Sequence, residues 1–161
     1  PRGPLRRAVR WVLLGAASGV LAGLASAAFL EALDAVTRLR LDHPALVWFL
    51  PLAGLAVGGA YHLFGGRAGE GSGLLIDEIH EPTAWVPRRM APMVGLGTLV
   101  SHLFGASVGR EGTALQMSGS LSDLLGRTVR LEPAERRVLL VTSLAAGFGA
   151  MQGRRRRKAD A

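Results

Sequence analysis

The chain has 161 residues, of which 49% belong to the apolar set, and its mean hydropathy is +0.29. It contains no cysteine, which excludes disulfides and thiolate metal sites. The net charge of +7 depends on basic residues that flank apolar runs and lack interleaved aromatic side chains, so we expect no nucleic-acid partner.

Long uncharged runs predict an all-α integral membrane protein that crosses the bilayer several times. These runs are residues 11–30 (20 residues), 44–66 (23), 90–109 (20) and 138–153 (16). A bilayer-spanning helix needs about 20 apolar residues, so three runs qualify and the fourth is marginal. We predict helices, and no strand, over residues 11–38, 44–64, 73–80, 87–105, 113–125 and 133–152.

The first predicted helix has features that suggest its orientation and its packing. Arg2, Arg6, Arg7 and Arg10 precede it, and the positive-inside rule then places the N-terminus in the cytoplasm. Gly15, Gly19 and Gly23 form a small-residue stripe that would let another helix approach closely. In the second predicted helix, Pro51 indicates a kink.

A glycine-dense loop over residues 65–73 leads into a short segment that bears acidic residues. The segment, residues 74–81, is too short to cross a membrane at 1.5 Å per residue. Ser72 is a good N-cap residue by type, and its hydroxyl could equally donate to an anion.

The sequence Gly109-Arg110-Glu111-Gly112-Thr113 lies between two apolar segments. A helix that begins at Thr113 would direct its free N–H groups, and the positive end of its dipole, at a ligand. Those features predict an anion site with Glu111 at its mouth. Short, glycine-interrupted helices in a membrane domain often converge on a transported anion, so Gly71-Ser72-Gly73 would form the second side of this site.

These residues together resemble the CLC family of chloride channels and anion/proton exchangers. The resemblance rests on Gly109-Arg110-Glu111-Gly112 with Gln116, on Gly71-Ser72-Gly73, on Glu78, and on the small residues 145–149. It implies the N-terminal half of an inverted-repeat helical bundle with broken half-helices. It also implies a halide and a proton as transported partners, a bacterial inner (plasma) membrane location, and a homodimer for a full-length protein.

The anion stays open between chloride and fluoride, and the mode of transport between channel and exchanger. Thr113 stands where many chloride-handling members have proline, and Leu74-Leu75 stands where they have Ile-Pro. The Gly-Arg-Glu-Gly-Thr sequence, Gln116-Met117 and the run Asp77-Glu78-Ile79-His80 look closer to the bacterial fluoride-exporting branch. That branch usually lacks a serine at the Ser72 position, so Ser72 favours the chloride-handling members instead.

The resemblance also implies roles for single residues. Glu111 would be the gating and proton-carrying group, because an ionised carboxylate competes with the anion and a protonated one withdraws. The anion-binding residues would be Gly71, Ser72, Gly73, Gly109, Arg110, Gly112 and Thr113. Arg110 would support the local structure or its electric field rather than bind the anion directly. We expect no metal and no cofactor.

The apolar sequence changes abruptly to arginine after Gly153. We interpret residues 1–153 as a partial transmembrane domain, and residues 154–161 as a basic tail left by truncation or a frame-shift. A segment of this kind is expected to be inactive alone. The alternative is a non-transporting membrane protein that packs through glycine-zipper helices. An enzyme is not expected, since the sequence has no Ser-His-Asp order, metal motif or phosphate loop.

Overall fold

The computed structural model describes the backbone of residues 4–159 and the side chains of residues 5–150. Every regular element in this range is helical, which confirms the all-α prediction. The elements are α1 (Pro4–Asp42), η1 (Pro44–Phe49), α2 (Leu50–Ala60), η2 (Tyr61–Gly65), η3 (Gly66–Glu70), α3 (Ser72–His80), α4 (Met90–Leu103), α5 (Arg110–Thr128) and α6 (Pro133–Ala159).

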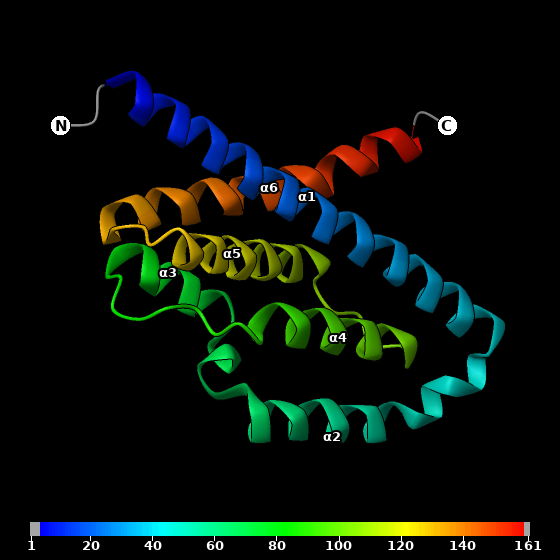
Figure 1. Ribbon diagram of the computed structural model, residues 1–161. Coiled ribbons are helices and arrows are strands. Elements are labelled where there is room, and N and C mark those ends of the chain that lie inside the picture. Colours follow the sequence, from blue (N-terminus) through cyan, green and yellow to red (C-terminus); the bar gives the residue numbers. More distant parts are fainter. Residues whose placement is uncertain (1–3, 160–161) are drawn as a thin grey trace.

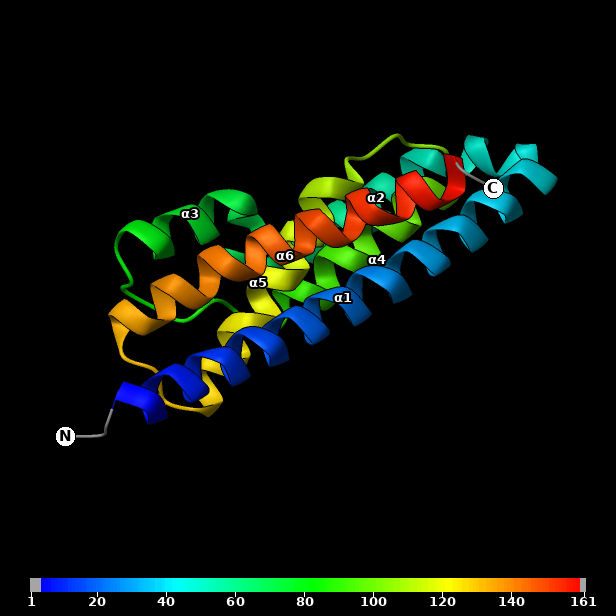
Figure 2. The ribbon, with the colours of Figure 1, turned by 90° about the horizontal axis from the view of Figure 1, so that it is seen from above.

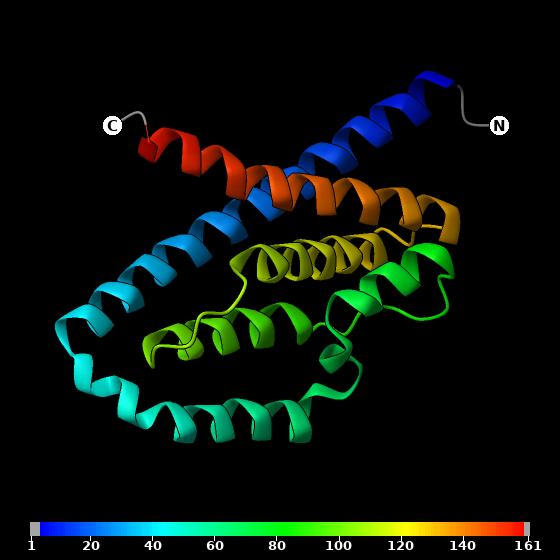
Figure 3. The same ribbon diagram turned by 180° about the vertical axis from the view of Figure 1, so that it is seen from behind.

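The helices stack in layers around α5 (Figure 1). α1 crosses α6 on one side of α5, and α4 separates α5 from α2 on the other. From above, α6 lies over α5 beside α1 (Figure 2), and the rear view shows α2 as the outermost layer (Figure 3). α5 therefore occupies the middle of the bundle, where its N-terminal motif is held by α1 and α4.

α1 spans 39 residues, or about 58 Å at the usual helical rise. One stripe of the helix is buried and consists of Leu14, Ser18, Ala22, Ser26, Phe29 and Leu33. The hydroxyls of Ser18 and Ser122 are 2.6 Å apart and join α1 to α5. At the start of the helix, Arg10 forms a 3.2 Å ion pair with Glu135 of α6. A polar contact thus supports both the α1–α5 and the α1–α6 interface.

The glycine stripe predicted to mediate helix packing does not do so in this structure. A Cβ added to Gly15, Gly19 or Gly23 would meet nothing within 4 Å. The reason is a rotation of one residue, about 100° around the helix. Ser18 and Ala22, rather than the adjacent glycines, face the neighbouring helices. The glycine-zipper interpretation is therefore wrong for α1.

Close helix approach occurs instead at glycines of α5 and α6. A Cβ on Gly119 would lie 2.8 Å from Leu75 Cδ1, and one on Gly147 would lie 2.8 Å from Ser118 Cβ. Gly147 is also 3.3 Å, by the same measure, from the carbonyl oxygen of Ala114. α5 and α6 are consequently packed closely enough that no side chain fits between them at this point.

Pro51 does not kink a helix, as the sequence suggested. It lies in the first turn of α2, and the preceding residues Pro44–Phe49 form a separate 3-10 helix. Proline is tolerated at a helix start because the N–H it lacks would have no partner there. α2 then presents exposed apolar side chains such as Leu52 and Leu55, which are 62% and 73% exposed.

By length and composition, two helical stretches of the described residues could cross a membrane. They are Leu5–Asp42 and Pro44–His80. The third predicted span is shorter than expected, because α4 covers only Met90–Leu103 and is followed by a turn at Gly105, where φ is +97°. α6 continues the predicted helix through residues 154–158 to Ala159, and the side chains of that basic run lie outside the described residues.

Candidate anion site

The helix of the Gly-Arg-Glu-Gly motif begins earlier than predicted. α5 starts at Arg110 with Gly109 as its N-cap, so Arg110 and Glu111 belong to the first helical turn. Thr113 is buried within the helix, where its hydroxyl donates to the Gly109 carbonyl at 3.2 Å and is 2.7 Å from the Thr98 hydroxyl of α4. Thr113 therefore joins two helices, and it does not form the helix start that the sequence suggested.

The start of α3 also differs from the prediction in one residue. Gly71 is the N-cap, with φ of +63°, a conformation that strains any residue with a side chain. Ser72 is the first helical residue, and its hydroxyl does not cap the helix. The hydroxyl oxygen instead accepts a 3.1 Å hydrogen bond from Nε2 of Gln116.

This bond joins the start of α3 to the helix that carries the second glycine motif. Gln116 lies five residues after Glu111, within the second turn of α5, so Ser72 packs beside the early part of that helix. α3 and α5 also run towards the same end of the bundle (Figures 1 and 3). Their starts therefore do not point apart.

Two of the predicted site glycines border open space. Gly73 is exposed beside Ser72, and a Cβ added to Gly112 would meet nothing within 4 Å.

Glu111 was expected to be poorly exposed, and in this structure it is exposed. The first turn of α5 borders an open hollow of about 480 Å³ between α1 and α4. The hollow is lined by Leu33, Asp34, Thr37, His102, Ser107, Val108, Gly109, Arg110 and Glu111. Glu111 is accessible because the first turn of α5 faces this open hollow and no side chain of the described residues fills it.

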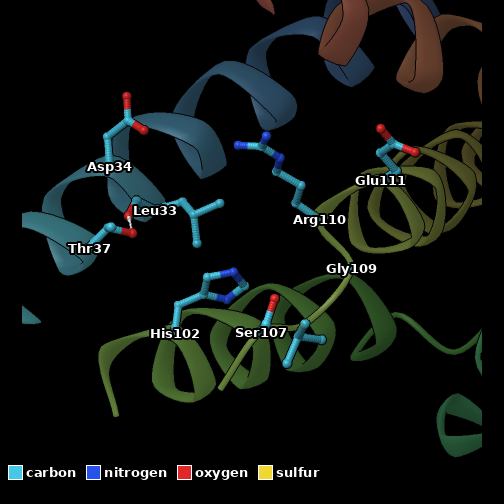
Figure 4. A pocket seen from close by; sticks show the side chains of 9 residues that line it. Leu33, Asp34, Thr37, His102, Ser107, Gly109, Arg110 and Glu111 are labelled. Atoms are coloured by element: carbon cyan, nitrogen blue, oxygen red, sulfur yellow. Dashed lines mark hydrogen bonds between the residues drawn. The ribbon is translucent and has the colours of Figure 1, made fainter. Parts of the chain in front are cut away.

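The hollow gathers charged and polar groups from three elements (Figure 4). Arg110 reaches towards α1, and the ring of His102 faces the hollow from α4. Nδ1 of His102 bonds to the Thr98 carbonyl oxygen at 2.9 Å, which places the ring proton on Nδ1. An acid, a guanidinium and an imidazole thus surround the mouth of the candidate site.

A buried ion cluster, which sequence reasoning did not predict, joins α3, α5 and α6. It consists of Glu78, Asp123 and Arg136, exposed by 1%, 1% and 4%. Nη1 of Arg136 is 3.0 Å from Glu78, and Nη2 of Arg136 is 3.2 Å from Asp123. Arg67 adds a second cation at 3.2 Å from Glu78. The cluster pairs each buried carboxylate with a guanidinium, which offsets the cost of removing both from water.

The same cluster fixes the loop that joins α3 to α4. The backbone N–H of Ala84 donates to Glu78 at 3.1 Å, and that of Val86 donates to Asp123 at 2.7 Å. The guanidinium of Arg136 stacks 4.7 Å from the Trp85 ring centroid. Asp123 was the available signal in the sequence, because an acid between apolar helical positions requires a partner. Its partners lie too far along the chain for spacing to identify them.

Among the side chains of residues 5–150, no group of three or more His, Asp or Glu could hold a metal ion.

Half-helices that meet at two glycine motifs, in a layered all-helical bundle, define a class of membrane transport domains. Residues 53–152 match the family described as "Voltage gated chloride channel", and the chain belongs to that family. The resemblance seen in the sequence is thereby confirmed.

Relatives and solved structures agree with this assignment. The chain is 54% identical over 144 residues to a "Chloride/fluoride channel protein" of Pseudomonas syringae pv. tomato, an alignment that covers 89% of this chain and 32% of that protein. It is 33% identical over 156 residues to the "H(+)/Cl(-) exchange transporter ClcA" of Salmonella arizonae, covering 86% and 32%. A crystal structure of a CLC-type fluoride/proton antiporter matches with a TM-score of 0.81 and 34% identity, over 86% of this chain and 35% of the other.

The chain spans about a third of the length of the relatives that it matches. The fold matches the CLC type over that third. The relatives are named as channels, exchangers and antiporters, which are transporters and not enzymes in the usual sense.

Proposed function

We propose that this chain supplies one side of a pathway that moves a halide, chloride or fluoride, across a membrane. Transport would follow a channel or an anion/proton antiport mechanism. The observation that carries the proposal is the hydrogen bond between Gln116 and Ser72, which holds the start of α3 against the second turn of α5 within a CLC-type fold. Helix N-termini attract anions through free N–H groups without the tight binding of a full charge.

Glu111 is the gate in this proposal. Its place in the first turn of α5 puts a carboxylate at the positive end of that helix, where an anion would also be attracted. When ionised, Glu111 competes with the halide for this position. When protonated, it withdraws and carries a proton, so one side chain can link the two fluxes. Arg110, which lines the same hollow, contributes positive potential at the entrance.

The glycines of the anion site contribute through the backbone. We assign the site to Gly71, Ser72, Gly73, Gly109, Arg110, Gly112 and Thr113. In this assignment Thr113 acts by fixing the first turn of α5 against α4, because its hydroxyl is already engaged. Gly112, where an added Cβ would meet nothing within 4 Å, leaves space for an anion to reach amide groups.

The proposed setting is the inner membrane of a bacterium. Residues 1–153 would form part of a transmembrane domain with the N-terminus in the cytoplasm and the exposed apolar side chains of α1 and α2 against lipid. A full-length protein containing this segment is expected to be a homodimer.

A chimera tests the proposal, because the aligned third of the Pseudomonas syringae relative can be replaced by this chain's segment. The chimera is reconstituted in liposomes loaded with chloride or fluoride, and efflux is followed with anion electrodes. We expect efflux of at least one halide from the chimera and none from the 161-residue chain alone. A well-folded chimera that moves neither halide would contradict the proposal and favour a packing role.

A further inference from the structure

We propose that Gln116 is a positioning residue that orients the Ser72 hydroxyl so that its proton points at the transported anion. The inference deepens the proposed function and rests on it. It assigns to Gln116 a role in halide affinity that is distinct from the roles of Glu111 and of the helix N-termini.

The first step is that the helix does not use the Ser72 hydroxyl. A serine at a helix start commonly accepts a hydrogen bond from an N–H of the first turn. Here the capping position is occupied by Gly71, which has no side chain that could cap the helix. Ser72 is one residue further on, at the start of α3, and its oxygen faces α5 instead.

The second step is the direction of the hydrogen bond. Nε2 of Gln116 donates to Ser72 Oγ at 3.1 Å. A serine hydroxyl has one proton and two lone pairs, and an amide nitrogen can only donate. With a lone pair engaged by Gln116, the hydroxyl proton must point elsewhere. A halide accepts hydrogen bonds and cannot donate them, so this arrangement presents the partner that a halide needs.

The third step is that the amide lies against the turn into α3. A Cβ on Gly71 would be in ordinary contact with Nε2 of Gln116 at 3.6 Å, and the positive φ of Gly71 disfavours any side chain there. Gln116 and Ser72 are both partly buried. The glycine before Ser72 therefore permits the turn that brings the start of α3 to the Gln116 amide.

A double-mutant cycle in the active chimera tests the proposal. Gln116→Met keeps the length of the side chain but cannot donate, and Ser72→Ala removes the hydroxyl. We expect Gln116→Met to weaken the halide affinity about 5-fold to 10-fold, measured by calorimetry with chloride and fluoride. In the Ser72→Ala background the same change should have no further effect, because Gln116 acts through that hydroxyl.

Two results would overturn the inference while leaving the proposed function intact. One is a Gln116→Met chimera with unaltered halide affinity. The other is a double variant whose affinity loss equals the product of the two single losses. A parent chimera that binds no halide would instead remove the proposed function and this inference together.

A second measurement does not require the variant chimeras to fold. The 161-residue chain contains two glutamines, Gln116 and Gln152, so a glutamine side-chain ¹⁵N label gives two amide signals. Ser72→Ala should shift the Gln116 signal and leave that of Gln152 in place. A Gln116 amide that does not respond to Ser72→Ala would show that the hydrogen bond is absent, and the inference would be wrong.

Discussion

At the scale of single residues, Glu111 combines an exposed position with a place in the first turn of a helix. We expect Glu111→Gln in the active chimera to remove proton movement, while halide movement persists and loses its pH dependence. The amide has the size of the protonated acid and cannot compete with the anion. Simultaneous recording with an anion electrode and a pH dye provides the measurement. Anion-driven proton uptake that survives the substitution would show that Glu111 is not the gate.

The buried cluster gives a prediction about stability at the same scale. Arg136→Leu should lower the free energy of unfolding by about 3–5 kcal/mol, because it leaves the buried Asp123 without a cation and Glu78 with Arg67 alone. Arg137→Leu is the matched control: Arg137 is exposed and donates only to the His80 carbonyl, so its loss should cost about 1 kcal/mol or less. Denaturant unfolding in micelles, followed by circular dichroism, measures both.

Equal losses in these two variants would contradict the assignment of the cluster as a buried ion network. A further variant separates charge from shape. Replacing Glu78 and Asp123 by their amides in the Arg136→Leu background should recover part of the stability, because no unpaired buried charge then remains.

At the scale of elements, the α5–α6 interface depends on one glycine. Gly147→Ala should cost about 1–3 kcal/mol, since the new methyl group would lie 2.8 Å from Ser118 Cβ. Gly149→Ala, two residues further along α6, meets nothing within 4 Å and should be neutral or slightly stabilising. Thermal unfolding of the two variants in the same detergent compares them. A Gly147→Ala protein as stable as Gly149→Ala would show that the helices can separate without cost.

The elements also show what sequence reasoning can and cannot predict. Apolar runs and glycine motifs predicted every α-helix, because both signals act over a few consecutive residues. The start of α5 was misplaced by three residues, since Gly112 looks like a boundary and is in fact accommodated within the helix. The Glu78–Asp123–Arg136 cluster was not predicted, because its members lie up to 58 residues apart and meet only after α3, α5 and α6 have packed.

The glycine stripe of α1 illustrates a related limit. Small residues at every fourth position predict a close contact, but the sequence does not say which neighbouring stripe faces a partner. Ser18 and Ala22 occupy the contact in place of Gly15, Gly19 and Gly23. The two motifs of the candidate site could be located from residue types alone, whereas the link through Gln116 and the exposure of Glu111 required the fold. Their roles in anion binding stay predictions.

At the scale of the whole molecule, the orientation in the membrane can be tested without background labelling, because the chain has no cysteine. Ala8→Cys and Ala45→Cys place single thiols beyond opposite ends of the apolar part of α1. We expect an impermeant maleimide to label Ala45→Cys in intact cells and Ala8→Cys only after permeabilisation. The reverse pattern would show that the N-terminus lies outside.

The buried cluster has a consequence for how such a chain is made. Glu78 and Asp123 both emerge from the ribosome before Arg136, which follows Glu78 by 58 residues, whereas Arg67, the second partner of Glu78, emerges earlier. At 5–20 residues per second, synthesis of that interval takes roughly 3–12 s. Glu78 can pair with Arg67 during this time, but Asp123 is paired in the cluster with Arg136 alone, so α5 cannot be released singly without exposing a carboxylate to hydrocarbon. The insertion machinery must therefore hold α5 until α6 arrives, and the two should enter the bilayer as one unit.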